Sequence, residues 1–173
     1  ELNLSIEARN LERFITNFAG HDEIMIPKIW WEWTSERLIV QEYVGGVSGN
    51  DMAAVDAAGL DRKLLAARGA DAVLKMVLID GYFHADPHPG NVKYLPGSRI
   101  AFLDFGMVGR LPHPRRDHIV DLLAALAQRD EHGILNVLLE WTGETVVDEE
   151  RLAADIADFM FNYENLSLKD IQF

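Results

Sequence analysis

Two stretches of the sequence decide the fold: HADPHPGN at residues 84–91 and FLDFGMVG at residues 102–109. Between them lie two short β-prone runs, 92–95 and 99–103, joined by the turn residues Pro96-Gly97-Ser98. This pattern predicts a β-hairpin, whose two strands run antiparallel. Such a hairpin would bring Asp104, just after its second strand, back alongside Asn91, just before its first.

The polar side chains of these stretches match the needs of phosphoryl transfer. A carboxylate must orient the attacking hydroxyl and accept its proton, and oxygen ligands must hold Mg²⁺ against the triphosphate. We assign Asp86, in a loop braced by prolines, as the catalytic base, and Asn91 and Asp104 as magnesium ligands. The order H-x-D-x-x-x-x-N followed by D-F-G is typical of kinase catalytic and metal-binding loops.

The loop histidines leave alternatives open. We expect His84 to hold the loop through hydrogen bonds, because one carboxylate base is sufficient for the proton transfer. His88 suits loop packing and substrate contact equally. In an extended segment His84, Asp86 and His88 would share one face and could bind zinc or iron in a hydrolase. That interpretation leaves Asn91 and Asp104 without a role.

Composition narrows the function classes. The 173 residues are 49% hydrophobic and 25% charged, which suits one ordinary globular domain. The absence of cysteine excludes disulfides and thiolate sites, and the net charge of −12 argues against a nucleic-acid partner. No apolar run approaches the ~20 residues of a spanning helix. We expect a cytoplasmic protein or one peripheral to the inner membrane, and a chain cut from a longer protein.

Residue periodicity predicts an α+β fold with a largely helical second half. We expect Ile29, Trp31 and Trp33 to alternate on one strand face and pack into the core. The predicted strands are 24–33, 37–43, 92–95 and 99–103. The predicted helices are 1–19, a short one capped by Asp51 and ending near Gly59, 61–82, 114–128, 130–141, 148–162, and one starting near Ser167.

At this point the sequence resembles a known family, the UbiB/ADCK atypical kinases of the protein-kinase-like superfamily. DGYFHADPHPGN and RIAFLDFGMVGRLP are similar to the catalytic and metal-binding loops of that family. LIVQEYVGG, at 38–46, resembles its hinge, and ELNLSIEARNLERFITNF resembles its helix with an E-x-D motif. The resemblance implies a kinase-like fold, truncated to part of the N-lobe at 1–45 and a helical C-lobe at 46–173.

The resemblance also implies further site residues. Glu7 would pair the ATP-binding lysine and act in catalysis with Asp86. Nucleotide contacts would come from Glu1, the first E-x-D residue, from the main chain near Glu42 and Val44, and from His84. The third E-x-D position holds Asn3 in place of Asp. No lysine strand or nucleotide loop precedes Glu1, so we expect this chain alone to bind nucleotide poorly.

The implied function is an atypical kinase or ATPase that binds Mg-ATP and supports ubiquinone or other prenyl-lipid biosynthesis. A prenyl lipid or small molecule would be a partner, and the full-length protein could associate with a membrane. No long activation segment follows Gly106, which argues against a peptide acceptor. Arg110, Arg115 and Arg116 could meet phosphate or a lipid headgroup. The alternatives are an aminoglycoside- or choline-type small-molecule kinase and a non-catalytic nucleotide- or lipid-binding scaffold.

Overall fold

A computed structural model describes residues 3–143 and 146–162. The chain divides into two compact units, one up to Leu111 and one from Pro112 onward. The first unit contains both loops on which the functional assignment rests. The expected division into lobes after residue 45 falls inside this first unit and stays a prediction.

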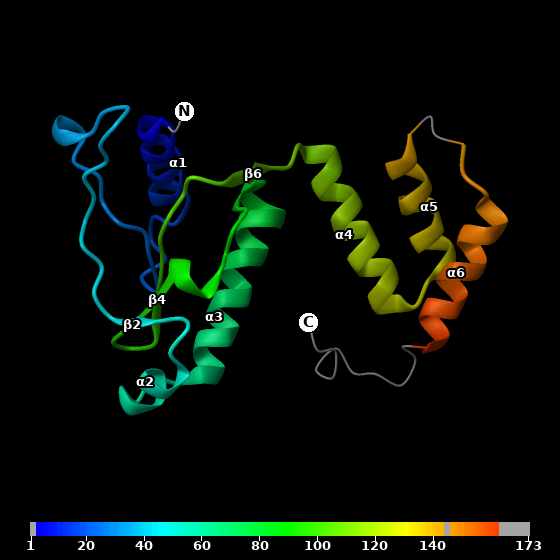
Figure 1. The fold of residues 1–173 in the computed structure, drawn as a ribbon. Helices are drawn as coiled ribbons and strands as arrows, with labels where there is room; N and C mark the ends of the chain where they lie inside the picture. The colour runs from blue at the N-terminus through cyan, green and yellow to red at the C-terminus, as the bar shows by residue number, and fades with distance from the viewer. Residues whose placement is uncertain (1–2, 144–145, 163–173) are drawn as a thin grey trace. The chain divides into compact units, whose positions relative to one another are not determined.

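The first helix, α1 (Leu4–Asn17), confirms the prediction for the start of the chain (Figure 1). It begins one residue after Asn3, whose side-chain oxygen accepts a hydrogen bond from the Ser5 N–H at 3.0 Å. Asn and Asp cap helices about equally well, so the departure from the E-x-D pattern preserves this role. The buried face of α1 carries Leu11 and Phe14, both fully shielded from solvent in the main core.

A four-stranded sheet lies at the centre of the first unit, in the order β1-β5-β4-β2. Its hairpin strands, β4 (Val92–Leu95) and β5 (Arg99–Phe102), pair antiparallel and confirm the predicted hairpin. β1 (Ile24–Met25) pairs parallel to β5, and β2 (Val47–Ser48) pairs antiparallel to β4. Helix α3 (Arg62–Leu74) packs against β5, and the short helix α2 (Met52–Ala57) adjoins β2 (Figure 1).

The predicted strands 24–33 and 37–43 are wrong in extent. Only Ile24–Met25 is a strand, and Trp31–Trp33 forms a 3₁₀ turn. Pro27 removes a ladder donor from the first segment, which shortens the strand. The two segments still meet through single bonds, such as Trp30 N–H to the Val40 carbonyl at 3.0 Å.

The tryptophans of this turn also correct the core prediction. Ile29 is buried, but the exposed fraction is 39% for Trp31 and 65% for Trp33. A 3₁₀ turn does not alternate its side chains as a strand does, so the three residues do not share a face.

The predicted helix 61–82 ends early. After α3 the chain continues as a π-helical segment, Lys75–Asp80, and Gly81 closes it in the left-handed conformation at φ 59°. Tyr82–His84 is then a strand, β3, which pairs antiparallel with β6 (Val108–Arg110). This two-stranded sheet was not predicted, because three-residue strands carry almost no periodicity.

The second unit contains three successive helices: α4 (His113–Gln128), α5 (Glu131–Thr142) and α6 (Glu149–Asn162). All three were predicted to within about two residues. Neighbours pack around a small apolar cluster that includes Ala125, Ile134 and Ile156. The predicted helix start near Ser167 lies outside the described residues.

The described residues combine helices and strands, as expected for an α+β fold. In the described part of the chain, no helix combines the length and the apolar character needed to cross a membrane.

Candidate active site

The hairpin brings Asn91 and Asp104 together. Val92 pairs with Phe102, and the Leu103 N–H donates to the Asn91 carbonyl at 2.8 Å. Asp104 comes directly after Leu103, the residue that is bonded to Asn91. The expectation that these two residues lie alongside one another is confirmed.

Asp86 joins this pair through Asn91. The Asn91 Nδ2 atom donates to the Asp86 carbonyl at 3.2 Å and lies 3.4 Å from Asp86 Oδ2. With its amide nitrogen turned toward Asp86, Asn91 keeps its amide oxygen for another partner. An amide oxygen is one of the oxygen ligands that Mg²⁺ accepts in proteins, and the ligand role of Asn91 stays a prediction.

His84 braces the two loops against each other. The ring is 4% exposed, its Nδ1 atom accepts from the Asp86 N–H at 3.1 Å, and its Nε2 atom lies 2.9 Å from the Leu103 carbonyl. A nitrogen that accepts carries no proton, so Nε2 must be the donor, and the neutral ring satisfies both bonds. The loop-holding role is confirmed, whereas a nucleotide contact from His84 stays a prediction.

His88 also stabilises the catalytic loop through a hydrogen bond to the main chain. Its Nδ1 atom accepts from the Gly90 N–H at 2.9 Å, which caps the 3₁₀ turn Pro89–Asn91. Because both nitrogens of His84 and one of His88 serve the main chain, the alternating His84, Asp86 and His88 set does not form a zinc or iron site.

Asp104 has an uncommon backbone conformation. Its φ is 56°, in the left-handed region that non-glycine residues rarely adopt. Its Oδ1 atom accepts from the Gly106 N–H at 3.2 Å, and the side chain is exposed. Backbone strain of this kind clusters at functional sites, where surrounding contacts hold it in place.

Glu7 reaches the same turn from α1. A Cβ atom placed on Gly106 would lie 3.2 Å from Asp104 Oδ1 and 3.7 Å from Glu7 Oε2, so the two carboxylates flank this glycine. Burial raises the pKa of Glu7 above its ordinary value and the charge of Asp104 raises it further, while a hydrogen bond from the Phe105 backbone lowers it. Two like charges around one turn are the arrangement that a cation would relieve.

The few oxygen ligands at the two loops suit Mg²⁺ better than a metal ion that is bound only by protein side chains. Among the residues that the structure covers, no three His, Asp or Glu side chains are grouped to bind a metal. Mg²⁺ commonly takes only one or two protein oxygens and completes its octahedron with phosphate oxygens and water. The amide oxygen of Asn91 and the second carboxylate oxygen of Asp104 are the two oxygens that the sequence predicts for this role.

The predicted hinge lies at the edge of the first unit. The Glu42 N–H donates to the Lys28 carbonyl at 2.8 Å, and the Glu42 carboxylate accepts from the Lys28 N–H at 3.2 Å. Val44 is buried beside Leu95 and Ala101. Within the described residues, no protein group bonds to the Glu42 carbonyl or the Val44 N–H. Glu1 lies outside the described residues.

Sequence reasoning missed a buried polar contact behind the site. Asn10, on the core-facing side of α1, is 7% exposed and donates from Nδ2 to the Phe105 carbonyl at 2.9 Å. The Tyr82 hydroxyl donates to Asn10 Oδ1 at 2.7 Å. The signal was present, since Asn10 interrupts an apolar face formed by residues such as Leu11 and Phe14.

The predicted basic cluster does not lie in one unit. Arg110 belongs to β6, and its guanidinium lies 5.5 Å from the centroid of the Tyr82 ring. Arg115 and Arg116 belong to the second unit. Their role at a phosphate or lipid headgroup stays a prediction.

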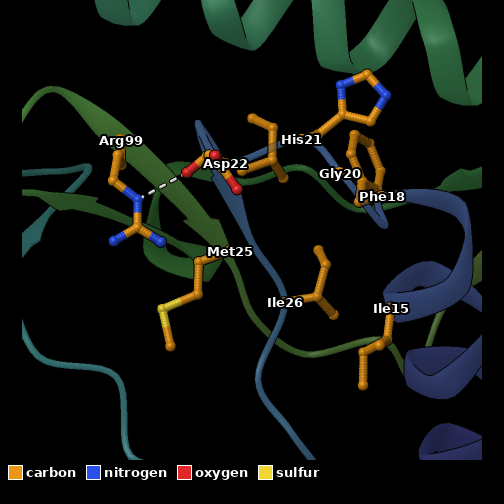
Figure 2. Close-up of a pocket in the computed structure, with 9 residues that line it drawn as sticks. Ile15, Phe18, Gly20, His21, Asp22, Met25, Ile26 and Arg99 are labelled. Atoms are coloured by element: carbon orange, nitrogen blue, oxygen red, sulfur yellow. Dashed lines mark hydrogen bonds between the residues drawn. The ribbon is translucent and has the colours of Figure 1, made fainter.

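A separate hollow of about 260 Å³ lies behind the end of α1 and contains none of the predicted site residues. Figure 2 shows apolar Ile15, Met25 and Ile26 along it and the Arg99 Nε atom bonded to the Asp22 carbonyl, at 2.8 Å. The loop site is therefore distinct from this hollow.

Comparison with known proteins gives a consistent result. The model of the ABC1 atypical kinase-like domain matches residues 1–138. An uncharacterized protein of Synechocystis is 38% identical over 134 residues, which cover 77% of this chain and 23% of that protein. The protein ACTIVITY OF BC1 COMPLEX KINASE 8, chloroplastic, of Arabidopsis thaliana is 34% identical over 142 residues, 81% of this chain and 19% of that protein.

A solved structure supports the fold. The chain of the Mycobacterium tuberculosis protein Rv3197, in its complex with erythromycin, superposes with a TM-score of 0.62 at 21% identity, covering 94% of this chain and 41% of that one. The chain spans about a fifth of the length of the two curated relatives described above. From its matched domain and these relatives, the chain belongs to the ABC1 atypical kinase-like family, which is the UbiB/ADCK family that its loops resemble.

Proposed function

We propose that the protein is an atypical kinase or ATPase of the UbiB type, which binds Mg-ATP and serves ubiquinone or other prenyl-lipid biosynthesis. The observation that carries the proposal is the meeting of Asp86, Asn91 and Asp104 where the two loops are joined by the Asn91–Leu103 backbone bond. Family membership supports the kinase class, and this geometry supports a competent site.

Each residue has a distinct task in this proposal. Asn91 and Asp104 would hold Mg²⁺, whose charge would offset the negative charge of the phosphates. Asp86 orients the attacking hydroxyl or water and accepts its proton. The Glu42 carbonyl and the Val44 N–H, which have no partner among the described residues, accept and donate bonds to the adenine edge. Glu7 pairs a lysine supplied by a longer protein.

We propose a small molecule or lipid as the phosphoryl acceptor, or water in an ATPase. Only six residues separate Gly106 from α4, which begins at His113, and Val108–Arg110 of these pair with β3. This short, hydrogen-bonded connection has no room for the long segment on which protein kinases hold a peptide.

Calorimetry with ATP and MgCl₂ tests the proposal in the full-length protein and in the 173-residue chain. We expect magnesium-dependent binding by the full-length protein, loss of that dependence in D104N, and weak binding by the chain alone. An unchanged magnesium dependence of ATP binding in D104N would contradict the proposed site. Turnover assays with and without prenylated phenols then separate a lipid-linked activity from an aminoglycoside- or choline-type kinase.

A further inference from the structure

The buried amide of Asn10 has no role in the site described so far. It lies on the core face of α1 and is almost fully shielded from solvent. A primary amide is costly to bury unless both of its ends are bonded, and both ends of Asn10 are. An apolar residue such as leucine has nearly the same shape and would avoid that cost.

The Asn10 amide belongs to a continuous chain of hydrogen bonds that ends on Asp104. The Tyr82 hydroxyl donates to Asn10 Oδ1 at 2.7 Å, and Asn10 Nδ2 donates to the Phe105 carbonyl at 2.9 Å. That carbonyl shares its peptide group with the Gly106 N–H, which donates to Asp104 Oδ1 at 3.2 Å. Bonds aligned head to tail in this way polarise and strengthen one another.

We propose that Asn10 is a positioning residue: with Tyr82 it fixes the Phe105–Gly106 peptide, and so directs the carboxylate of Asp104 for magnesium. The inference rests on the proposed function of Asp104 as a metal ligand. Asp104 adopts a left-handed φ of 56°, so the peptides around it need to be held by other groups. Asn10 donates to the carbonyl oxygen of the Phe105–Gly106 peptide, and Asp104 accepts from its N–H.

Apolar packing alone does not account for the amide. Phe105 is fully buried and its ring centroid lies 4.6 Å from that of Phe14, so the turn is already anchored by its side chain. Ring packing anchors the side chain and makes no bond to the polar atoms of the Phe105–Gly106 peptide. The hydrogen bond from Asn10 holds the oxygen of this peptide.

Four variants of the full-length protein test the role. N10L removes both bonds with little change in volume, and N10D keeps an acceptor for Tyr82 but loses the donor to Phe105. Y82F removes only the first bond of the chain. L65A is the control, because Leu65 lies in the same core cluster and its apolar side chain cannot hydrogen-bond to Tyr82, Asn10 or the Phe105 carbonyl. The measurements are the half-saturating Mg²⁺ concentration for ATP binding, the ATP affinity without Mg²⁺, and the melting temperature.

We expect N10L and N10D to raise the half-saturating Mg²⁺ concentration about tenfold and Y82F about threefold, because a lost bond next to a charged group weakens its alignment. ATP affinity without Mg²⁺ should not change, and L65A should lower only the melting temperature. A magnesium requirement in N10L and N10D equal to that of L65A overturns the inference. If neither Asn10 variant folds, Y82F decides, and an unchanged requirement there also overturns it.

The same experiment separates this inference from the proposed function. If wild type and D104N show no difference in magnesium dependence, Asp104 is not a metal ligand, and the positioning role fails with it. If D104N loses the dependence and the Asn10 and Tyr82 variants keep it, only the positioning role is wrong.

Discussion

The Lys75 ammonium lies 2.8 Å from the backbone carbonyl of Asn17, the last residue of α1, although 58 residues separate them. The last turn of α1 has no basic residue of its own. Lys75 therefore supplies the positive charge that favours a helix C-terminus, and it does so from the π-helical segment that precedes the catalytic loop. The same ammonium bonds both carboxylate oxygens of Asp80, at 2.9 and 2.8 Å.

From the ion pair between Lys75 and Asp80 we expect a single substitution to lower the free energy of unfolding more than a double substitution does. The side chains of Lys75 and Asp80 are only 16% and 11% exposed. K75M leaves Asp80 as a buried, unpaired charge, so we expect a loss of about 3 kcal/mol in the free energy of unfolding. K75M/D80N should lose less than K75M alone, as measured by urea denaturation. A double variant that is as unstable as the sum of the single ones would show that the pair is not coupled.

Glu7 predicts a pH-dependent effect on stability. Its pKa is raised in the folded chain, mainly by burial, so folding favours the protonated carboxyl. The stabilising contribution of that proton is complete below the unfolded pKa of about 4.3 and is lost as the pH rises through the folded pKa. In the 173-residue chain at neutral pH, E7Q should therefore melt at a higher temperature than wild type.

The difference between E7Q and wild type should shrink as the pH falls below about 4, where Glu7 is protonated in both states. E32Q is the matched control, because Glu32 is an exposed glutamate on the 3₁₀ turn. A stabilisation by E7Q that persists unchanged at acid pH would exclude the charge of Glu7 as its cause.

The structure shows which parts of the fold the sequence could predict. The β4–β5 hairpin was readable because Pro96-Gly97-Ser98 is strong turn chemistry between β-prone runs. The strand through Trp31 and Trp33 failed because an alternation of so few residues does not identify a strand, and these residues form a 3₁₀ turn with both tryptophans exposed. Helix 61–82 was too long because a π-helical segment has the same composition as an α-helix.

The candidate site was also predictable only in part from the sequence. Asp86, Asn91 and Asp104 were predicted from the order and spacing of the two loop motifs and from the hairpin between them, which the structure contains. The contact between Asn10 and the Phe105 carbonyl spans 95 residues, and no local pattern determines such a pair. The amide was visible only as a polar residue on an apolar helix face, which does not identify its partner.

Gly109 predicts a steric conflict that a second substitution relieves. A Cβ atom at this position would overlap the ring of Phe83, on the paired strand β3. G109A should therefore displace the Phe83 ring and cost about 1–3 kcal/mol of stability. F83A removes the ring, so adding G109A to F83A should cost less stability than adding G109A to wild type. Chemical denaturation of the four proteins measures both costs. Failure of F83A to reduce the cost of G109A would mean that the clash is not with this ring.

Asn3 predicts which substitutions the E-x-D position tolerates. Its side-chain oxygen caps α1, so N3A should lower stability by about 1 kcal/mol, whereas N3D should change it little. Thermal melts of the three proteins measure this difference. If N3D also leaves the magnesium-dependent ATP binding of the full-length protein unchanged, capping accounts for this position. A large gain in binding would instead assign the carboxylate a role at the nucleotide.

His84 predicts a local loss of structure at the two loops. H84F keeps a ring in the core beside Phe105, whose centroid lies 5.1 Å away, but leaves the Asp86 N–H and the Leu103 carbonyl without their partner. A fully buried group without a partner costs about 1–3 kcal/mol, and the cost here should be smaller because both bonds are only partly buried. We expect faster amide hydrogen exchange at residues 85–91 and 103–106, with exchange in α3 much less affected. Uniform acceleration across the first unit would show that His84 stabilises the core as a whole, and not the junction that holds Asp86 against Asn91.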